Sequence, residues 1–399
     1  MLAPLVCQQQ GTGTPAKALR IDGLEVLYQN GSTNSYSVDP ASITVIESGD
    51  SQPGSMSFTL SDPNGQVRLT PGQVVHFMDV TRNVPLFWGF IDSLDATSLG
   101  VGRTVQVECV GIGILLDWLI VPSASFPAYP GVVAAADAVQ GMIAQATGAG
   151  AGMIRAARTA ITSSTQANPV GMSSAPSAAV SVSGVTLRTA IQAVFTSVGT
   201  WMYDTFSVIN PGLLPDYRMQ IDWYGGLRVW DTSGNWAGYP VDWVGVTLTA
   251  HAPTDTSYSV AQGDARSVYV IGGNAAGTAL FPDGSGIPGP TAVINDSTIL
   301  TYGGAFSAAA SYFKANGVLA SGTVVSDEWD NIGTAGAEAH AGMTVTITDP
   351  NIGLSSFSAT INEISKTFNN SGTERWSISY GSRLRGSTYL RRLTSTTIK

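Results

Sequence analysis

Residues 54–118 read GSMSFTLSDPNGQVRLTPGQVVHFMDVTRNVPLFWGFIDSLDATSLGVGRTVQVECVGIGILLDW, a series of short apolar–polar alternations separated by turn residues. Alternation with a period of two is typical of a half-buried strand. The Asp-Pro-Asn-Gly sequence at 62–65 and the Pro-Gly pair at 71–72 are turn signals, since proline fixes φ and Asn-Gly tolerates positive φ. Strands are expected at residues 56–60, 67–69, 74–80, 86–91 and 104–110. Short strands joined by hairpin-length turns predict an antiparallel barrel or sandwich rather than a sheet of βαβ units.

The composition suits a mainly β protein with few surface charges. The chain has 399 residues, and charged residues make up 12% of them, about half the usual share of about 25%. A net charge of −9 argues against non-specific binding to DNA backbones. No run approaches the length of a membrane-spanning helix, and residues 1–10 lack the regions of a secretory signal. We therefore expect an intracellularly synthesised protein that hides much of its surface in an assembly.

The N-terminal third is expected to hold an arm and then strands. Residues 1–16 include Gln-Gln-Gln-Gly-Thr-Gly-Thr-Pro, which cannot form a packed element alone and is expected to be an arm. A first strand is expected at 19–28, and the β pattern continues at 43–47. Composition shifts after Val121, where Pro122, Pro127 and Pro130 suggest a linker.

The middle of the chain carries two helical patterns, near 132–146 and 183–198. The second is clearer: its apolar residues recur at helical spacing, with Ser183 as the expected N-cap and Gly199 as the expected stop. Residues 147–181 are rich in Ala, Gly, Ser and Thr and are expected to be a loop or a weakly patterned insertion. A strand is then expected at 201–204, followed by a hairpin with strands 219–223 and 227–230.

From Thr247 the pattern is β again. Residues 258–260 and 267–271 alternate, and the proline- and glycine-rich residues 281–303 are expected to be a long loop. A short helix is expected at 304–316. The last strands are expected at residues 343–348, 357–365 and 375–380.

Three groups of motifs resemble the baseplate hub family of bacteriophage tail tips, which includes distal minor tail proteins. The first, within 54–118, is S-x-F-T-L, then V-V-x-F and L-F-x-G-x-I, closed by Cys-Val-Gly and Ile-Leu-Leu-Asp. The second is a helix followed by G-T-W-M-Y-D and a hairpin with L-R-V-W. The third is G-M-T-V-T-I-T-D-P, followed by S-A-T-I-N-E-I-S-K-T-F and R-W-S-I-S-Y-G. Together they span most of residues 20–381.

The resemblance implies a mainly β fold with minor α, in which two tail-tube-like antiparallel β-barrels are joined by smaller αβ domains. With the composition shifts it divides the chain into an arm (1–16), a first hub barrel (17–121), an αβ connecting domain (122–246), a second hub barrel with an associated αβ element (247–381) and a basic tail (382–399).

The function that the resemblance implies is structural. A baseplate hub caps the tail tube as a homotrimer, adapts the sixfold tube to a threefold tip, and forms part of the channel for genome ejection during host cell entry. Its expected partners are a tail tube or distal tail protein above, a central fibre or tip protein below, and the tape measure protein and genomic DNA in the lumen. The expected location is the virion tail tip, assembled in the host cytoplasm without a membrane anchor. Gene transfer agents and contractile secretion machines use similar hubs, and the motifs do not separate them from a phage.

Residues that carry chemistry are sparse, and we expect no catalytic residue, cofactor or metal. The histidines His76, His251 and His340 have no metal-ligand spacing, and the glycine-rich residues 272–277 lack a nucleotide motif. The two cysteines, Cys7 and Cys109, make neither a metal pattern nor a disulfide framework, and Cys109 is expected to be buried and inert.

Two alternatives to a hub remain open from the sequence. A receptor- or carbohydrate-binding β protein would use aromatic stacking, and four tryptophans cluster at Trp223, Trp230, Trp236 and Trp243. A β-rich hydrolase would need two carboxylates facing a cleft, and the dense acidic cluster is residues 327–330, Asp-Glu-Trp-Asp.

The C-terminal segment reads as either a solvated terminus or a peptide that docks on an acidic neighbour or nucleic acid. It has no acidic residue, and its basic residues are Arg383, Arg385, Arg391, Arg392 and Lys399.

Overall fold

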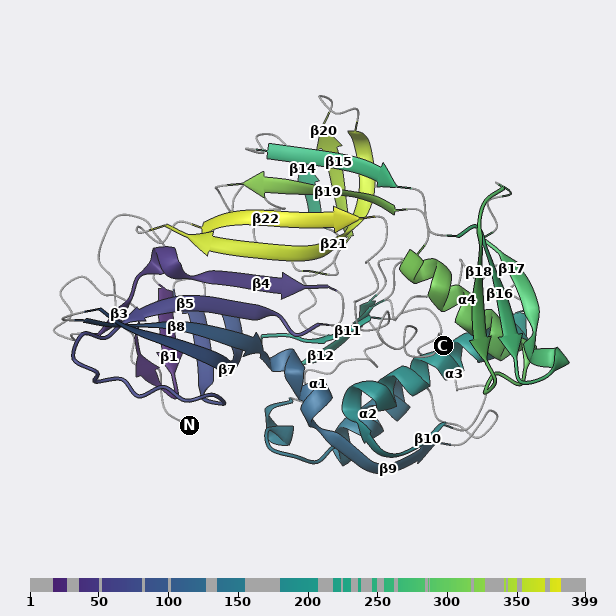
Figure 1. Ribbon diagram of the computed structural model, residues 1–399, viewed down its shortest axis with the longest axis horizontal. Coiled ribbons are helices and arrows are strands. Elements are labelled where there is room, and N and C mark those ends of the chain that lie inside the picture. The colour runs from purple at the N-terminus through teal and green to yellow at the C-terminus, as the bar shows by residue number, and fades with distance from the viewer. Residues whose placement is uncertain are drawn as a thin grey trace.

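A single 14-stranded sheet contains strands from both ends of the chain (Figure 1). Its main path runs β15-β19-β22-β21-β4-β5-β8-β7-β6-β1-β2, with β3, β14 and β20 attached beside it. The mainly β fold expected from the sequence is confirmed. The computed structural model describes residues 17–26, 36–49, 52–80, 83–99, 102–126, 135–154, 180–206, 218–223, 225–230, 236–237, 246–249, 255–261, 265–283, 286, 288–316, 319–326, 341, 344–349, 354–369 and 374–381.

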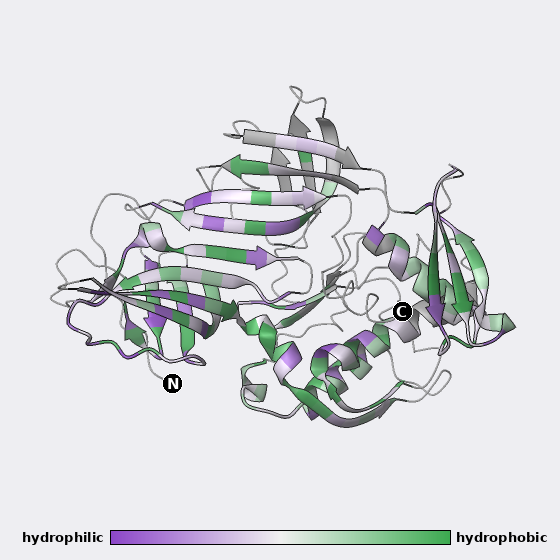
Figure 2. Cartoon of the chain, viewed as in Figure 1, coloured by the Kyte–Doolittle hydropathy of each residue, from purple (hydrophilic) through white to green (hydrophobic). Residues whose placement is uncertain are grey.

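The N-terminal strand set forms a closed ring of strands. Its members are β1 (Lys17–Ile21), β2 (Leu24–Glu25), β3 (Ser37–Val38), β4 (Thr44–Ser48), β5 (Ser55–Ser61), β6 (Val74–Asp79), β7 (Val84–Leu99) and β8 (Gly102–Gly111). Val26 closes the ring, because its N–H donates to Leu19 of β1 and its carbonyl accepts from Val38 of β3, which pairs with β5. Hydrophobic and hydrophilic residues alternate along these strands, as expected for strands with one buried face (Figure 2).

Two strand predictions in this set are wrong. Residues 67–69 form no strand, because the buried Asp62 carboxylate accepts hydrogen bonds from the backbone N–H groups of Gln66 and Val67 and holds the chain in a loop. The strand expected at 19–28 is broken at Asp22 and Gly23, which both have positive φ and turn β1 into β2.

Helices gather on one side of the molecule in the connecting region (Figure 1). The elements are η2 (Ile112–Ile114), α1 (Leu115–Trp118), β9 (Ile120–Phe126), α2 (Ala135–Gln145), η3 (Ala151–Met153), β10 (Val180–Thr186) and α3 (Leu187–Phe206). The helix expected near 132–146 is α2. Arg188 at the start of α3 makes a bidentate ion pair with Asp117 of α1, at 2.7 and 2.9 Å. In the described part of the chain, no helix combines the length and apolar character needed to cross a membrane.

The second helix was predicted with the wrong ends. Ser183 lies in β10, which pairs with β9, and the hydroxyl of Thr186 accepts from the N–H of Thr189 at the true start. The helix also continues through Gly199 to Phe206, so the expected strand at 201–204 is helix. A mid-helix glycine costs only about 1 kcal/mol, and the face of α3 buried against α2 and α4 outweighs that cost.

A small three-stranded sheet follows, made of β11 (Arg218–Ile221), β12 (Leu227–Trp230) and β13 (Trp236–Ala237). β11 and β12 form the hairpin predicted from the sequence, with Gly225 at positive φ in its turn.

The C-terminal strand set comprises β14 (Val246–Thr249), β15 (Asp255–Ala261), β19 (Leu319–Ser326), β20 (Thr344–Asp349), β21 (Leu354–Phe368) and β22 (Glu374–Gly381). The last three match the expected final strands within a few residues. β14 pairs with β20 in parallel, whereas the other described strand pairs of this set are antiparallel.

An αβ unit is inserted between β15 and β19. It comprises β16 (Ser267–Gly272), η7 (Ala275–Gly277), β17 (Ala279–Pro282), β18 (Thr291–Asp296) and α4 (Tyr302–Asn316). The loop expected at 281–303 is wrong in part, since it contains the end of β17 and all of β18, which pairs with β16 in parallel. Apart from Pro282, which ends β17, the prolines and glycines that suggested a loop lie between these two strands.

The two strand sets repeat one another. Five strands of one set correspond, in chain order, to five of the other: β4, β5, β6, β7 and β8 to β15, β19, β20, β21 and β22. Corresponding strands also have corresponding neighbours in the sheet. Phe90 of β7 and Thr360 of β21 are counterparts, because each pairs with the first residue of the adjacent strand, β6 or β20. Both strands then shift register against their hairpin partner just after an isoleucine, Ile91 or Ile361. The chain therefore contains two copies of one strand arrangement, joined where β21 pairs with β4.

Candidate functional site: the junction between the two strand sets

The site that the structure offers is a junction between two halves of one chain. β4 of the N-terminal set pairs antiparallel with β21 of the C-terminal set. The residues that lie opposite one another are Glu363 and Ser48, Ile364 and Glu47, Ser365 and Ile46, Lys366 and Val45, and Thr367 and Thr44. Five successive pairs make the two sets one continuous sheet, so the halves are fixed relative to each other by backbone hydrogen bonds.

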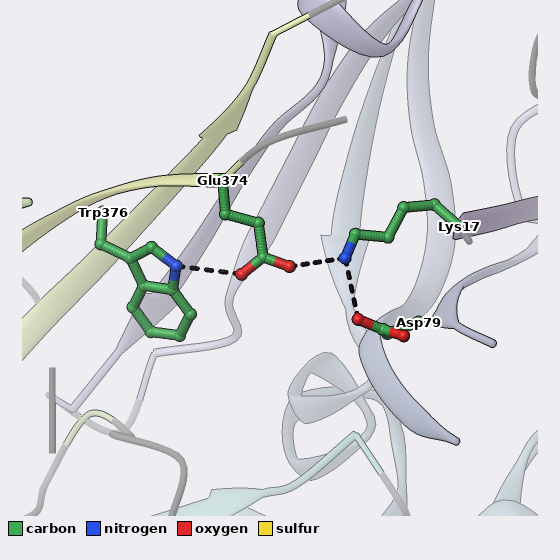
Figure 3. A network of polar contacts seen from close by, with 4 residues as sticks. All are labelled: Lys17, Asp79, Glu374 and Trp376. Carbon is green, nitrogen blue, oxygen red and sulfur yellow. Dashed lines mark hydrogen bonds and ion pairs between the residues drawn. The ribbon is translucent and has the colours of Figure 1, made fainter. Parts of the chain in front are cut away.

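A buried ionic network crosses this junction (Figure 3). The Lys17 ammonium of β1 contacts Asp79 of β6 at 2.8 Å and Glu374 of β22 at 2.7 Å. The indole N–H of Trp376 donates to the other carboxylate oxygen of Glu374 at 3.0 Å. All three charged side chains are at least 95% buried, so each charge depends on these partners for the solvation that water would give it. The network therefore fixes the last described strand against the first described one.

A cation–π contact of Lys366 and one aromatic pair complete the buried side of the junction. The Lys366 ammonium lies 4.0 Å from the centroid of the Trp376 ring, a cation–π geometry. Phe368 of β21 packs edge-on against Phe77 of β6, with centroids 5.2 Å apart. Lys366 is 2% exposed, so both its charge and its aliphatic stem are enclosed by protein.

The β11–β12 hairpin is anchored to the N-terminal strand set by Trp223. A Cβ atom added at Gly54 or Gly111 would lie within 3 Å of the Trp223 ring, so only glycine leaves room for it there. The ring also packs against Phe87, with centroids 5.1 Å apart. Because Trp223 is 6% exposed, it cannot offer its face to a sugar. Trp230 and Trp236 lie opposite each other in β12 and β13, and Trp243 lies outside the described residues.

The described residues contain no group of three or more His, Cys, Asp and Glu side chains that could hold a metal ion. His76 lies in β6 with its ring edge-on to Trp88, 5.0 Å between centroids, which is a packing role. Cys109 is buried in β8 as expected, and burial raises the pKa of its thiol, with Glu108 and Asp92 adding in the same direction. A thiol with a raised pKa is a poor nucleophile.

Several residues singled out in the sequence lie outside the described part of the chain. They are Cys7 and the rest of the 1–16 arm, His251, the acidic cluster 327–330, His340 and the basic segment 382–399.

Four junction residues were not predicted from the sequence: Lys17, Asp79, Lys366 and Glu374. Each occupies a buried position in a strand, where an apolar residue is the norm. A charged residue that interrupts the apolar phase of a strand was the available signal. Such a signal does not reveal which strand supplies the partner, because Lys17 and Glu374 are separated by nearly the whole chain.

Comparison with solved structures identifies the fold. The 43 kDa tail protein of prophage MuSo2 from Shewanella oneidensis superposes with a TM-score of 0.60 at 12% identity, covering 91% of this chain and 97% of that one. A tail protein from Neisseria meningitidis MC58 superposes with a TM-score of 0.58 at 13% identity, covering 94% of this chain and 99% of that one. No protein-family model and no curated protein sequence matches the chain. The chain has the fold of these two tail proteins, as the resemblance to tail hubs implied.

Proposed function

We propose that the chain is a structural protein of a virion tail tip, a baseplate hub or distal minor tail protein. The observation that carries this proposal is the internal repeat, which gives one chain two similar strand sets fixed side by side by the β4–β21 junction. The likeness to two tail proteins over nearly their whole length supports it.

The repeat suits a symmetry adaptor. A ring of three such chains presents six similar strand sets, so a threefold tip meets a sixfold tail tube with one set opposite each tube subunit. A rigid junction is needed for this role, because the two sets of one chain must keep the spacing that the tube imposes. The buried network of Lys17, Asp79 and Glu374 supplies rigidity of this kind.

The ring would surround part of the channel for genome ejection. With a net charge of −9, the chain repels rather than retains phosphate, so DNA slides past it. In this proposal a tail tube or distal tail protein lies above the ring, a central fibre or tip protein lies below it, and the tape measure protein and DNA pass through. The chain carries no catalytic task there.

Light scattering on the purified full-length protein over a concentration series tests the proposal. A mass near three times 41.4 kDa, with rings that have a central hole in negative-stain micrographs, is the expected result. A monomer at every concentration would contradict a self-assembling ring and favour a receptor-binding module, which a glycan-binding screen would then examine.

A further inference from the structure

The internal junction between β21 and β4 indicates a second interface of the same kind, which a single copy of the chain does not form by itself. β7 is the repeat counterpart of β21, and β15 is the counterpart of β4. On the β6 side, β7 is paired only as far as Ile91, whose N–H donates to Gln73. Beyond that point no described strand pairs with this edge of β7. β15 ends the sheet, and its outer edge likewise pairs with no described strand.

Each edge is the counterpart of a strand that is paired inside the chain. The equivalent residues are found by following the pairs between neighbouring strands. In the N-terminal set these pairs lead from β7 through β8 to β5, and in the C-terminal set they lead from β21 through β22 to β19. The counterparts in β7 and β21 are Ser93 and Glu363, Leu94 and Ile364, Asp95 and Ser365, Ala96 and Lys366, and Thr97 and Thr367. The counterparts in β4 and β15 are Thr44 and Ser257, Val45 and Tyr258, and Ile46 and Ser259.

We propose that the edge of β7 beyond Ile91 in one copy pairs antiparallel with β15 of a second copy, in the register of the internal β21–β4 junction. Transferring that register places Asp95 opposite Ser259, Ala96 opposite Tyr258, and Thr97 opposite Ser257 of the second copy. The inference rests on the proposed ring and specifies the residues that close it.

The occupant is a second copy because the two edges are complementary and lie on different strand sets of one chain. Contact between different patches of identical chains is head-to-tail, and such contacts close into a ring when the rotation permits. In the ring, every β7–β15 contact repeats the geometry of the β21–β4 contact. Neighbouring strand sets are therefore all related by nearly the same rotation about the ring axis.

The side chains at the two edges fit this pairing. Lys366 faces Val45 inside the chain, whereas Ala96 would face Tyr258, so a large residue meets a small one in both cases with the sides exchanged. Ala96 and Tyr258 are both exposed in the single chain. The hydroxyl of the buried Tyr380 donates to the carbonyl of Ser257 at 2.7 Å, which holds β15 in place at its inner side.

Oxidative cross-linking of the full-length protein tests the register. The test variant carries Asp95→Cys and Ser259→Cys in a Cys7→Ser background, with the buried Cys109 retained. The matched control carries Asp95→Cys and Tyr258→Cys, whose side chains would lie on opposite faces of the paired strands. Because directly opposite residues have Cβ atoms about 4.5–5.5 Å apart, we expect at least about tenfold more covalent dimer and trimer from the test pair.

The outcomes separate this inference from the proposed function. A ring-sized assembly in which neither pair links, or in which the control links as well as the test pair, would overturn the register and leave the ring intact. A protein that stays monomeric in light scattering and gives no cross-link would overturn both proposals.

A charge substitution gives a second test that needs no oxidation. Ser259→Asp places a carboxylate opposite Asp95 of the neighbouring copy, whereas Ser259→Lys places an ammonium there. Directly opposite like charges destabilise a strand pair and opposite charges stabilise it, so the dissociation constants should differ by about 2- to 5-fold per interface. Equal assembly of the two variants would contradict the predicted neighbours, and because Ser259 is exposed, both variants should fold.

Discussion

The internal junction and the two edges proposed to pair between copies have the same backbone plan but different side chains. At the junction, Ile364, Lys366 and Phe368 of β21 are all buried. Their counterparts in β7 include Leu94, which is half-buried, and Ala96, which is exposed. The positions that hold large or charged side chains in β21 therefore hold small or partly exposed side chains in β7.

In the proposed assembly, the difference follows from when each interface forms. The junction forms as the chain folds, so it never has to be soluble by itself and can contain aromatic rings and buried ions. A free edge must survive in water before assembly, and natural proteins protect such edges with bulges and charges. The bulge after Ile91 has its equivalent in β21, so it does not distinguish the two strands, whereas two aspartates, Asp92 and Asp95, lie at the start of the β7 segment beyond Ile91.

The largest predicted effect comes from breaking the junction at its ions. Lys17→Met removes the cation that Asp79 and Glu374 share and leaves their charges in a buried site. Removing one partner of a buried ion pair typically costs about 3–5 kcal/mol, so the free energy of unfolding, measured with urea, should fall by about that amount.

The control for this variant is Arg20→Ala. Arg20 pairs with Glu25 at 3.2 Å, and both side chains are more than 20% exposed, so the expected cost is at most about 1 kcal/mol. Equal losses in the two variants would show that burial of the Lys17 network contributes nothing to the junction.

A smaller effect separates the two counterparts Ile364 and Leu94. Ile364→Ala removes a fully buried side chain and should cost about 2–5 kcal/mol in the single chain. Leu94→Ala removes one that is half-buried, so we expect about 1 kcal/mol in the single chain and a further loss in assembly. Urea titration of dilute protein measures the first quantity and light scattering the second. A Leu94 variant that assembles normally would count against β7 as an interface.

Local patterns predicted much of this fold. The alternation in β5, β6 and β8 gave strand positions within about two residues, because one face of each strand is buried and the pattern records it. The errors came where pairing with a segment distant in the sequence determines the local secondary structure. β10 is a strand because it pairs with β9, about sixty residues earlier, and that pairing moved the start of α3 away from Ser183.

The candidate site was harder to predict than the elements, although the sequence holds a signal for it. β7 and β21 share the spacing F-x-G/A-x-I-D/N-x-L/I-x-x-T, which begins at Phe87 and at Phe357. This internal repeat indicates two equivalent strand sets. It does not indicate the buried ions, since at equivalent positions β21 has a charged residue, Lys366, and β7 has a small uncharged one, Ala96.

The smallest predicted effect concerns the tie that holds the edge strand. Tyr380→Phe removes the hydroxyl that donates to the Ser257 carbonyl and leaves the ring in place, and one such bond contributes about 1 kcal/mol. Tyr269→Phe, at an exposed tyrosine of the αβ unit, is the control and should change stability by less than about 0.5 kcal/mol. Amide hydrogen exchange should quicken in β15 and β19 of the Tyr380 variant and remain unchanged in β5 and β8. If β15 is an assembly edge, loosening it also weakens the ring, because the second copy must then order the strand that it binds. A variant with faster exchange in β15 but unaltered ring assembly would place the intersubunit contact on another surface.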